Sequence, residues 1–567
     1  MTRLSRENRI VNAATHGYAI PRQGPCYRCS VTIETPAPAT DADSDELIEA
    51  LTRIVGESHV HASVADRLFY STDVLSTGVI AAAAVSPASP AEVSTVVAVC
   101  TAAGFAVIPR GAGLSYTGGY TPRVPRSVTV DLQRLNRIVE INAEDMYISV
   151  EAGCSWKQIL DALEPLGLRT PFWGPVSGHS STVGGALSQG SIYYGSARYG
   201  STADSVLGMQ VVLADGTMVT TGSGSARVAA SPFFRNFGPD LTGLFLNDSG
   251  ALGIKTVATL KLIRNPIATD FLSFSFESYA QCTKVLSEIC RRGLASECYA
   301  FDPFMHGLRL KRESLVEDFR RLVSVARAGK SLISGARDAA RIALTGRAAF
   351  KDVQYAMHVM LEGRGASLVS AECAEVRDIA FRSGGREIEA TLPRVQRSEP
   401  FFSRYGNGTL NPEGQRYLPV HGICPHSRAD AVIEAIQAVF AQFDAALEPN
   451  HVEWGYVMCG ISTHAVIIEP LIFWADAPNQ YHQRVVEPGY LAGLPKHAAN
   501  SAGTELVRDL STALKQEFMR LGCTHLQIGK SYPYREGRQR ASFALLESIK
   551  RALDPAGRVN PGSLGLD

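Results

Sequence analysis

The chain has 567 residues, more than the roughly 250 to 300 at which a single hydrophobic core stops growing, so at least two domains are expected. Its 55 Lys and Arg residues balance its 55 Asp and Glu residues, which leaves no net charge to attract nucleic acid or an anionic membrane. No stretch of about 18 residues is continuously apolar, and the N-terminal residues lack the apolar core of a secretory signal. We therefore expect a cytoplasmic protein with no membrane span and no nucleic-acid partner.

The eleven cysteines are an odd number scattered over a long chain, which fits reduced thiols better than a disulfide framework. One CxxC pair is present, at Cys26 and Cys29, but the nearby His59 and His61 fall outside the usual spacings of a zinc site. We predict no metal site. The pair is interpreted as incidental to a flexible N-terminal arm, with a metal or redox role as the minor alternative.

The first segments in chain order predict an arm, two helices and a strand. Residues 35–45 are small, Pro-rich and acidic, which is typical of a linker, so the arm is placed at residues 1–44. From Asp45, DELIEALTRIVG has helical spacing, and SPASPAEVSTVVAVCTAAG predicts a capped helix that ends at Gly104. AVIPR then predicts a short buried strand. The chain up to about residue 265 is rich in glycine and in short β-runs: SVTVDL, ISVEAG, LGMQVVLADGTMVTTG and ALGIKTVATLKLI.

The character of the sequence changes after Asn265-Pro266. Residues 310–390 contain long charged stretches of helical type with few glycines, which indicates a different domain. A further helical run, TELVRDLSTALKQEFMRLG, leads to GKSYPYREGR and to the terminal DPAGRVNPGSLG. The predicted division is therefore an arm, a first domain at 45–266, a second domain at 267–500 and a C-terminal segment at 501–567.

Two glycine-rich segments are candidates for binding a nucleotide. The first, Pro109 to Gly119, follows a predicted strand, and its glycines allow backbone N–H groups to converge on an anion without obstruction by a Cβ atom. It is neither a Rossmann fingerprint, because no helix pattern follows it, nor a P-loop, because it lacks a terminal GK[ST]. The only GKS, at residues 329–331, has Ser324 where a P-loop needs its first glycine. Taken alone, the first segment could also be an ordinary glycine-rich turn.

The second segment, at residues 174–190, is another loop of small and hydroxyl residues. It is followed by Tyr199-Gly200 and by a predicted strand that ends in Ala214-Asp215-Gly216. Two such loops around a β-rich frame suit a long dinucleotide in an extended groove.

The order of five motifs resembles that of the vanillyl-alcohol oxidase and p-cresol methylhydroxylase (VAO/PCMH) superfamily of FAD-dependent oxidoreductases. The motifs are PRGAGLSYTGG, SSTVGGALSQGS, YGSTADSVLGMQVVLADGTMVTTGS, DLTGLFLNDSGALGIKTVATLKLI and the C-terminal DPAGRVNPG. The resemblance covers about residues 60–567, and the motifs are individually loose but jointly specific. It implies an α+β fold in which a PCMH-type bipartite FAD-binding domain, 45–266 and 501–567, encloses a separate α/β substrate cap domain at 267–500. It also favours a homodimer.

The resemblance further implies which residues contact FAD. In the hydroxy-acid branch of the superfamily a Ser-Glu-Gly usually precedes the turn beside the cofactor, whereas here it reads Asp248-Ser249-Gly250. The implied FAD contacts are Pro109, Arg110, Gly111, Ala112, Gly113, Leu114, Ser115, Gly118 and Gly119 in the first loop, Ser180, Ser181, Thr182, Gly184 and Gly185 in the second, then Gly253 and Ile254, and finally Asn560 near the C-terminus.

Oxidation of an alcohol by a flavin needs groups that position the substrate and accept the hydroxyl proton. Candidates cluster in three cap segments, 416–426, 458–469 and 525–535. By resemblance, His464 falls at or beside the histidine through which some members bond covalently to the flavin; the alternative is a hydrogen-bonded core histidine. KSYPYR combines Pro rigidity with donors for a carboxylate or phenolate, or else is a solvated loop. The catalytic candidates are His421, His464, His525, Lys530, Tyr534 and Arg535, with His426 and, in the first loop, Tyr116 as weaker ones.

Departures from the family patterns bear on the substrate. The acidic residue of several phenol-oxidising members is replaced by Val176 or Ser177, and their phenolate-binding Tyr-Arg pair falls near His525 and Gln527. The GDGNxH signature of metal-assisted 2-hydroxy-acid dehydrogenases is also absent. We predict an FAD-dependent oxidase or dehydrogenase that oxidises an alcohol, aromatic or benzylic, by hydride transfer to flavin N5. A 2-hydroxy-acid dehydrogenase of lactate or glycolate type and a flavin-carrying electron-relay protein are the alternatives, and the electron acceptor is left open.

Overall fold

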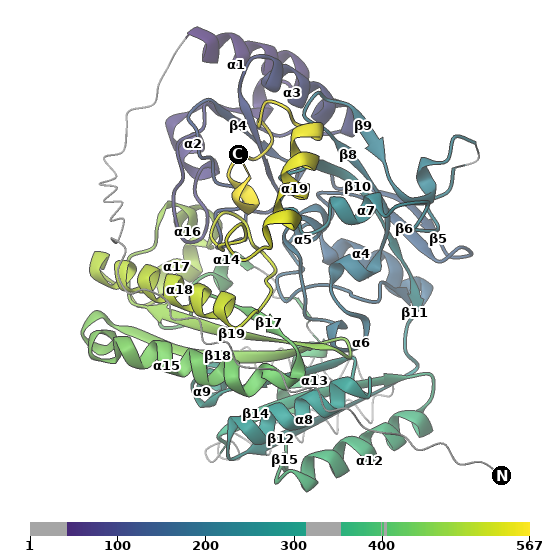
Figure 1. The fold of residues 1–567 in the computed structure, drawn as a ribbon, viewed down its shortest axis with the longest axis vertical. Coiled ribbons are helices and arrows are strands. Elements are labelled where there is room, and N and C mark those ends of the chain that lie inside the picture. Colours follow the sequence, from purple (N-terminus) through teal and green to yellow (C-terminus); the bar gives the residue numbers. More distant parts are fainter. Residues whose placement is uncertain (1–41, 229, 313–352, 399, 402–404, 567) are drawn as a thin grey trace, which may run out of the picture. The chain divides into compact units, whose positions relative to one another are not determined.

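The structure is a computed structural model that describes residues 42–228, 230–312, 353–398, 400–401 and 405–566. Helices and sheets both run through these residues, which confirms the predicted α+β class (Figure 1). Within the same ranges no helix is both long and apolar enough to cross a bilayer. The CxxC pair and the GKS at 329–331 lie outside the described residues.

A four-stranded sheet with helices against it forms the first part of the described chain. Its elements are α1 (Ala42–Val55), β1 (Val60–His61), α2 (Val64–Tyr70), β2 (Ala83–Val85), α3 (Pro90–Ala102), β3 (Ala106–Arg110) and β4 (Ser127–Asp131). The strand order is β1-β2-β4-β3, and β4 pairs in parallel with both β2 and β3. α1 packs on α3, and α3 packs on β3, so the helices cover the apolar side of this sheet.

Helix α3 shows how the local sequence produces this packing. Ser89 caps the helix by accepting a 3.2 Å hydrogen bond from the Glu92 N–H, and Pro90 occupies its first turn. Val93, Val96 and Val97 are fully buried at helical spacing and form one apolar stripe. The helix stops at Ala102, two residues before the predicted Gly104, whose φ of +80° does not continue an α-helix.

A second sheet of five antiparallel strands follows, in the order β5-β6-β10-β8-β9. Its strands are β5 (Ile138–Asn142), β6 (Tyr147–Glu151), β8 (Val206–Val212), β9 (Met218–Thr220) and β10 (Ile254–Lys261), and the predicted β-runs coincide with them. The intervening elements are α4 (Trp156–Leu163), β7 (Leu168–Arg169), α5 (Val183–Gln189), α6 (Ser196–Tyr199), α7 (Leu241–Leu244) and β11 (Ile263–Arg264). Strand β11 pairs with β7 in a two-stranded sheet, and the strands that follow β11 in the chain belong to a third sheet.

The third sheet contains the strands from residue 268 to residue 474, and all its pairings are antiparallel. Its order is β15-β12-β14-β13-β18-β19-β16, with β17 paired to β19. The strands are β12 (Ala268–Phe276), β13 (Glu297–Phe301), β14 (Tyr355–Gly363), β15 (Arg386–Ile388), β16 (Arg416–Pro419), β17 (Gly422–Cys424), β18 (Val452–Ile461) and β19 (Ala465–Trp474). We refer to this sheet as the cap sheet.

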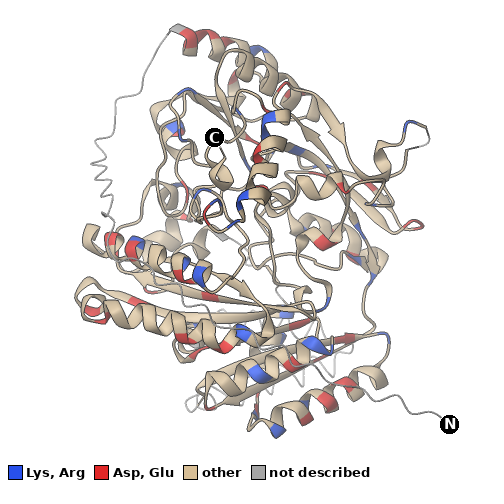
Figure 2. Ribbon diagram, viewed as in Figure 1, with Lys and Arg blue, Asp and Glu red and all other residues tan. Residues whose placement is uncertain are grey.

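Long helices run along the cap sheet (Figure 1). They are α8 (Tyr279–Arg291), α12 (Ala366–Arg382), α15 (Ala429–Leu447) and α18 (Ser501–Arg520); shorter helices are α9 (Pro303–Arg312), α13 (Thr391–Ser398), α14 (Tyr405–Gly408), α16 (Gln480–Val485) and α17 (Pro488–Gly493). Figure 2 shows both charge signs on the long helices, whereas the strands are mostly uncharged. Because α18 packs on α15 and β19, it belongs with the cap sheet, which differs from the predicted boundary at 501.

The C-terminal segment returns to the first sheet after α18. Val559 forms a parallel bridge with Val107 of β3, with hydrogen bonds from the Val107 N–H to the Arg558 carbonyl (2.8 Å) and from the Asn560 N–H to the Val107 carbonyl (2.9 Å). Helix α19 (Arg540–Leu553) precedes this bridge, and Lys550 Nζ donates to the Ala251 carbonyl at 2.8 Å. The end of the chain, yellow in Figure 1, thus completes the N-terminal sheets.

Candidate cofactor and substrate site

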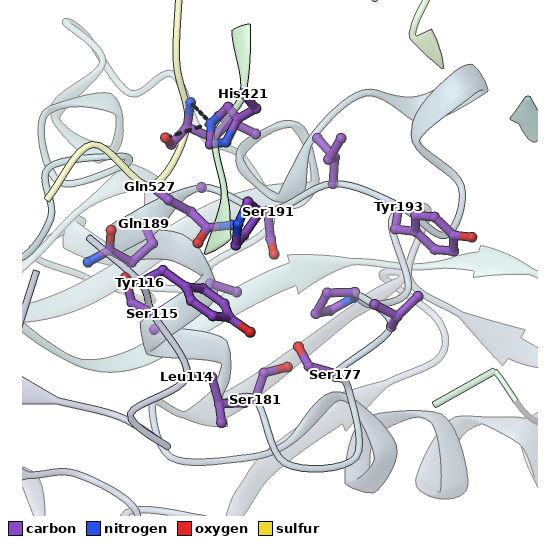
Figure 3. A pocket seen from close by; sticks show the side chains of 18 of the residues that line it. Leu114, Ser115, Tyr116, Ser177, Ser181, Gln189, Ser191, Tyr193, His421 and Gln527 are labelled. Atoms are coloured by element: carbon purple, nitrogen blue, oxygen red, sulfur yellow. Dashed lines mark hydrogen bonds between the residues drawn. The ribbon is translucent and has the colours of Figure 1, made fainter. Parts of the chain in front are cut away.

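A cavity of about 340 Å³ lies between the two glycine-rich segments and the cap sheet. Figure 3 shows Leu114, Ser115 and Tyr116 of the first segment, together with residues of the second segment, around it. On the other side it is lined by β13, β18, β19 and the residues after β16. Its size is in the range of ligand-binding pockets, about 300 to 1,000 Å³.

The first glycine-rich segment begins where β3 ends and lines the cavity from Pro109 to Tyr116 and at Gly119. In the described part of the chain, no protein acceptor takes a hydrogen bond from the backbone N–H groups of Gly111 to Leu114. Gly113 has a φ of +74°, a conformation that glycine adopts without strain, and its carbonyl accepts a 2.5 Å hydrogen bond from the Tyr120 hydroxyl. A loop that lines a cavity and whose N–H groups have no protein acceptor suits a pyrophosphate.

Asn560 fixes this loop to the C-terminal segment. Its Nδ2 donates to the Gly119 carbonyl (2.8 Å) and the Ser249 carbonyl (2.7 Å), and its Oδ1 accepts from Lys530 Nζ at 2.8 Å. Lys530 also donates to the Thr121 carbonyl at 2.6 Å. Asn560 does not line the cavity, and its hydrogen bonds hold the loop in position.

The second segment is not only a loop, because α5 starts inside it. Thr182 caps the helix by accepting from the Gly185 N–H at 3.2 Å, while the Gly184 N–H donates to the Ala152 carbonyl at 2.8 Å. Ser181 is the preceding residue, and its Oγ is buried with no hydrogen-bond partner within the described chain. An unpaired buried hydroxyl beside a helix N-terminus is a further position for a phosphate or a flavin oxygen.

The turn before β10 supplies a third edge. Ser249 and Gly250 line the cavity, and the buried Asp248 is paired with Lys255 at 2.6 Å. Ile254 is the first residue of β10. It packs in the core of the first sheet, with 1% of its surface exposed. Gly253 is packed so closely on β8 that an added Cβ would lie 2.5 Å from Val211 Cγ1. Of this turn, Ser249 and Gly250 line the cavity, whereas the predicted Gly253 and Ile254 do not.

These observations fit a dinucleotide of the FAD type. Unpaired N–H groups, an orphaned hydroxyl and a helix N-terminus surround one cavity, as a pyrophosphate and a ring system with polar edges require. The predicted residues that line the cavity are Pro109, Arg110, Gly111, Ala112, Gly113, Leu114, Ser115, Gly119, Ser181, Thr182, Gly184 and Gly185; the predicted Gly118 and Ser180 do not line it.

On its cap side the cavity is bordered by one face of the cap sheet, to which alternate residues of its strands contribute. Successive side chains of a strand point to opposite faces, so residues 467, 469, 471 and 473 of β19 share one face, opposite Val457 and Cys459 of β18. The aromatic neighbours on this face are Tyr299 and Phe301. Apart from Glu469, the strand residues of this face are apolar or aromatic.

His421 and Glu469 form the polar part of the cap side. His421 Nδ1 lies 3.7 Å from Glu469 Oε1, and burial lowers the pKa of His421 to about 3. Burial raises the pKa of Glu469 to about 7. Both residues line the cavity, and Figure 3 places His421 at its cap end. A neutral imidazole beside a carboxyl group that titrates near neutrality is a common arrangement for acid–base chemistry.

The structure separates the other predicted catalytic residues from this cavity. His464 lies exposed in the turn between β18 and β19, because it falls between the strands and not within one. His525 packs on Tyr532 and contacts the His421 carbonyl through Nδ1 at 2.8 Å. None of His464, His525, Lys530, Tyr534 or Arg535 lines the cavity.

The KSYPYR cluster has contacts of another kind. Burial lowers the pKa of Lys530 to about 7, and its ammonium group donates to Asn560 and to the Thr121 carbonyl, two residues after the first loop. Arg535 is paired with Glu547 at 3.2 Å on the surface, and Tyr534 packs on Phe543. In the described residues these side chains contact protein groups and do not line the cavity, so the proposed substrate role of the cluster stays a prediction.

The prediction from sequence missed Glu469 as a site residue, although its segment was singled out. A signal was present: Glu469 is the one charged residue in the apolar run of β19, AVIIEPLIFW. In the described residues, no group of three or more His, Cys, Asp and Glu side chains is arranged to hold a metal ion.

Comparisons with known proteins identify the nucleotide-binding part. Residues 81–222 match the family model described as an FAD binding domain, which confirms FAD as the predicted cofactor. Glycolate oxidase subunit GlcD of Bacillus subtilis is 31% identical over 242 residues, 42% of this chain and 50% of that protein. The mitochondrial D-lactate dehydrogenase (cytochrome) 1 of Saccharomyces cerevisiae is 30% identical over 210 residues, 37% of this chain and 34% of that protein. The chain thus matches half or less of the length of these relatives.

A solved structure shows the same fold over nearly the whole chain. The crystal structure of p-cresol methylhydroxylase with substrate bound superposes with a TM-score of 0.68 and 17% identity, over 93% of this chain and 98% of that one. At this identity the likeness concerns the fold alone, and it confirms the predicted PCMH-type architecture.

Proposed function

We propose that this chain, which belongs by its FAD-binding domain and its fold to the VAO/PCMH superfamily of flavoproteins, oxidises the CH–OH group of a small hydroxy compound with an apolar body. The coarse part of this proposal, an FAD-dependent oxidoreductase acting on hydroxy groups, is supported by relatives whose names are glycolate oxidase subunit and D-lactate dehydrogenase. The finer part rests on the cap side of the cavity.

The two glycine-rich segments would hold the cofactor. The N–H groups of Gly111 to Leu114 and the Ser181 hydroxyl are positioned for its phosphates and polar edges. When bound, FAD accepts the hydride of the substrate C–H bond. The protein's own residues orient the substrate, exclude water and receive the hydroxyl proton.

The apolar face of the cap sheet is the observation that carries the substrate proposal. Phe301, Val457, Ile467, Leu471 and Phe473 line the cavity opposite the glycine-rich segments. Burial of an aromatic ring against such a face contributes about 1.5 to 3 kcal/mol relative to water. Glu469 is the one carboxylate among the described lining residues, and it disfavours a substrate carboxylate nearby. An uncharged aromatic or benzylic alcohol satisfies both features.

A 2-hydroxy acid is the second candidate. The names of the relatives favour it, and Arg309 of α9 places a cation on the cap side of the same cavity. If a carboxylate binds there, Arg309→Met should raise the KM for the hydroxy acid and leave that for an uncharged alcohol unchanged.

Four substrates in a two-by-two design separate the candidates. Benzyl alcohol and mandelate share a ring and differ by a carboxylate, and ethanol and lactate form the matching pair without the ring. We expect benzyl alcohol to reduce the flavin anaerobically about ten to a hundred times faster than ethanol at equal concentration, which corresponds to the ring-burial energy, and faster than lactate as well. Faster reduction by lactate and mandelate than by their alcohols would transfer the proposal to hydroxy acids. Reduction by none of the four would overturn the substrate assignment altogether.

A further inference from the structure

The position of Glu469 does not fit a carboxylate with a purely structural role. It lies on the cavity face of β19 opposite Val457, with Ile467 and Leu471 as its neighbours on that face. Among the described residues it has no hydrogen-bond partner, and its one charged or ionisable contact within 4 Å is His421. A carboxylate held on an apolar cavity face, mostly out of water and without a hydrogen bond, costs folding free energy, which indicates a use outside the folding of the chain.

The neutral His421 imidazole can interact with the Glu469 carboxyl group whether that group is ionised or protonated. Its Nε2 lies 2.8 Å from the Leu526 carbonyl and 3.0 Å from the Leu526 N–H, so a partner exists whether Nε2 donates or accepts. The opposite nitrogen, Nδ1, faces Glu469. A neutral imidazole can therefore present Nδ1–H to an ionised Glu469, or a lone pair to a protonated one, by changing tautomer without gaining charge.

The backbone of His421 is also fixed. Its N–H donates to the Tyr532 hydroxyl at 2.9 Å, and the same hydroxyl lies 3.3 Å from Nδ1. The imidazole is 5% exposed, so it has little freedom to leave this position, whereas 28% of the Glu469 side chain is accessible from the cavity. The exposed part is what a substrate can reach.

We infer that Glu469 is the catalytic base that takes the hydroxyl proton of the substrate, and that His421 is the positioning residue that holds Glu469 toward it. This inference rests on the proposed function. In the step, the substrate O–H bond would break with its proton passing to Glu469 Oε, and the C–O bond would become a carbonyl as bound oxidised FAD supplied the acceptor for the C–H hydrogen and its electron pair. One proton and one hydride are released, so the alcohol loses two electrons and the cofactor gains them.

The charged and ionisable groups around Glu469 predict how the step depends on pH. His421 stays neutral because burial lowers its pKa to about 3, and burial raises the pKa of both Tyr532 and Cys459 well above neutrality. Glu469, with its pKa raised to about 7, is the group that titrates in the working range. Because the ionised form accepts the proton, flavin reduction should accelerate as the pH rises through about 7 and level off above it.

Glu469→Gln tests the inference with two readouts. Anaerobic flavin reduction by the best substrate of the panel should slow at least a hundredfold at pH 8, since general base catalysis contributes about 10² to 10⁴, and its pH dependence near 7 should vanish. In the substrate-free holoenzyme, the infrared band of a protonated carboxyl group should titrate near pH 7 in the parent and be absent in the variant. His421→Asn should shift that infrared titration, which a merely structural role would not do.

Glu453→Gln is the matched control, because Glu453 is an exposed carboxylate on the neighbouring strand β18 and bonds to Gln415 at 2.9 Å. It should keep the parent rate and the infrared titration. If Glu469→Gln reduces the flavin at the parent rate, or keeps the titrating band, the assignment of Glu469 is wrong. Failure of the proposed function would give a different result from failure of the Glu469 assignment. In that case no substrate of the panel would reduce the flavin of the parent protein, while the infrared titration would persist.

Discussion

Gly111→Val is expected to reduce the FAD content of the purified protein at least tenfold while the chain stays folded. An added Cβ at this position would lie 2.3 Å from Thr182 Oγ1, far inside contact distance. Thr182 caps α5, so the substitution displaces the second glycine-rich segment as well as the first. Loss of one helix cap costs about 1 kcal/mol, which the fold tolerates, whereas both edges of the cofactor site move. The measurement is the ratio of flavin to protein absorbance, with circular dichroism as the test of folding.

Gly365→Val provides the control for this substitution. Gly365 precedes α12 in an extended conformation, and an added Cβ there meets no atom within 4 Å. This variant should retain the parent's FAD content. If Gly111→Val retains it equally well, the first segment does not border the cofactor.

Glu362→Gln is expected to lower the free energy of unfolding by about 3 to 5 kcal/mol, the usual cost of removing one partner from a buried ion pair. Glu362 of β14 accepts from Arg169 of β7 at 2.5 and 3.2 Å, and their side chains are 1% and 2% exposed. Arg397 lies 3.5 Å from the same carboxylate. The variant therefore leaves the buried Arg169 guanidinium without its counter-charge. Chemical denaturation at a fixed FAD concentration measures the loss.

The comparison for this prediction is Glu387→Gln. Glu387 pairs with Arg377 at 2.9 Å, but about a third of each side chain is exposed (36% and 38%). Surface pairs of this kind contribute about 0 to 1 kcal/mol. Equal losses for the two variants would mean that the Arg169–Glu362 pair does not hold β7 against the cap sheet.

Local sequence patterns were sufficient to predict the helices and strands whose formation depends mainly on neighbouring residues. The helix after Ser89 and the strand Ala106–Arg110 follow from a cap, an apolar stripe and a short β-branched run. Helix α5 was missed because glycines and a serine in its sequence argue against a helix. The reason for the glycine is tertiary: an added Cβ at Gly184 would lie 2.7 Å from Ala152 Cβ.

The same distinction between local sequence and distant contacts applies to the residues of the candidate site. Glycine-rich segments are visible in a sequence, and most of the residues selected in them line the cavity. The direction of the Lys530 side chain was not visible, because it depends on the carbonyl of Thr121 and on Asn560, both far away in the chain. His464 was selected by resemblance to the histidine that some family members bond to the flavin, yet it falls in the turn between two strands and does not line the cavity. Glu469 needed the strand register, which decides which face of β19 meets the cavity.

The flavin content of the purified protein tests the central claim most directly. The account predicts a yellow protein with an FAD absorption spectrum and an equimolar amount of FAD per chain, either as purified or after incubation of the apoprotein with FAD. A colourless, cooperatively folded chain that takes up no FAD would contradict the assignment of the cavity between the two glycine-rich segments, and with it every functional proposal built on that cavity.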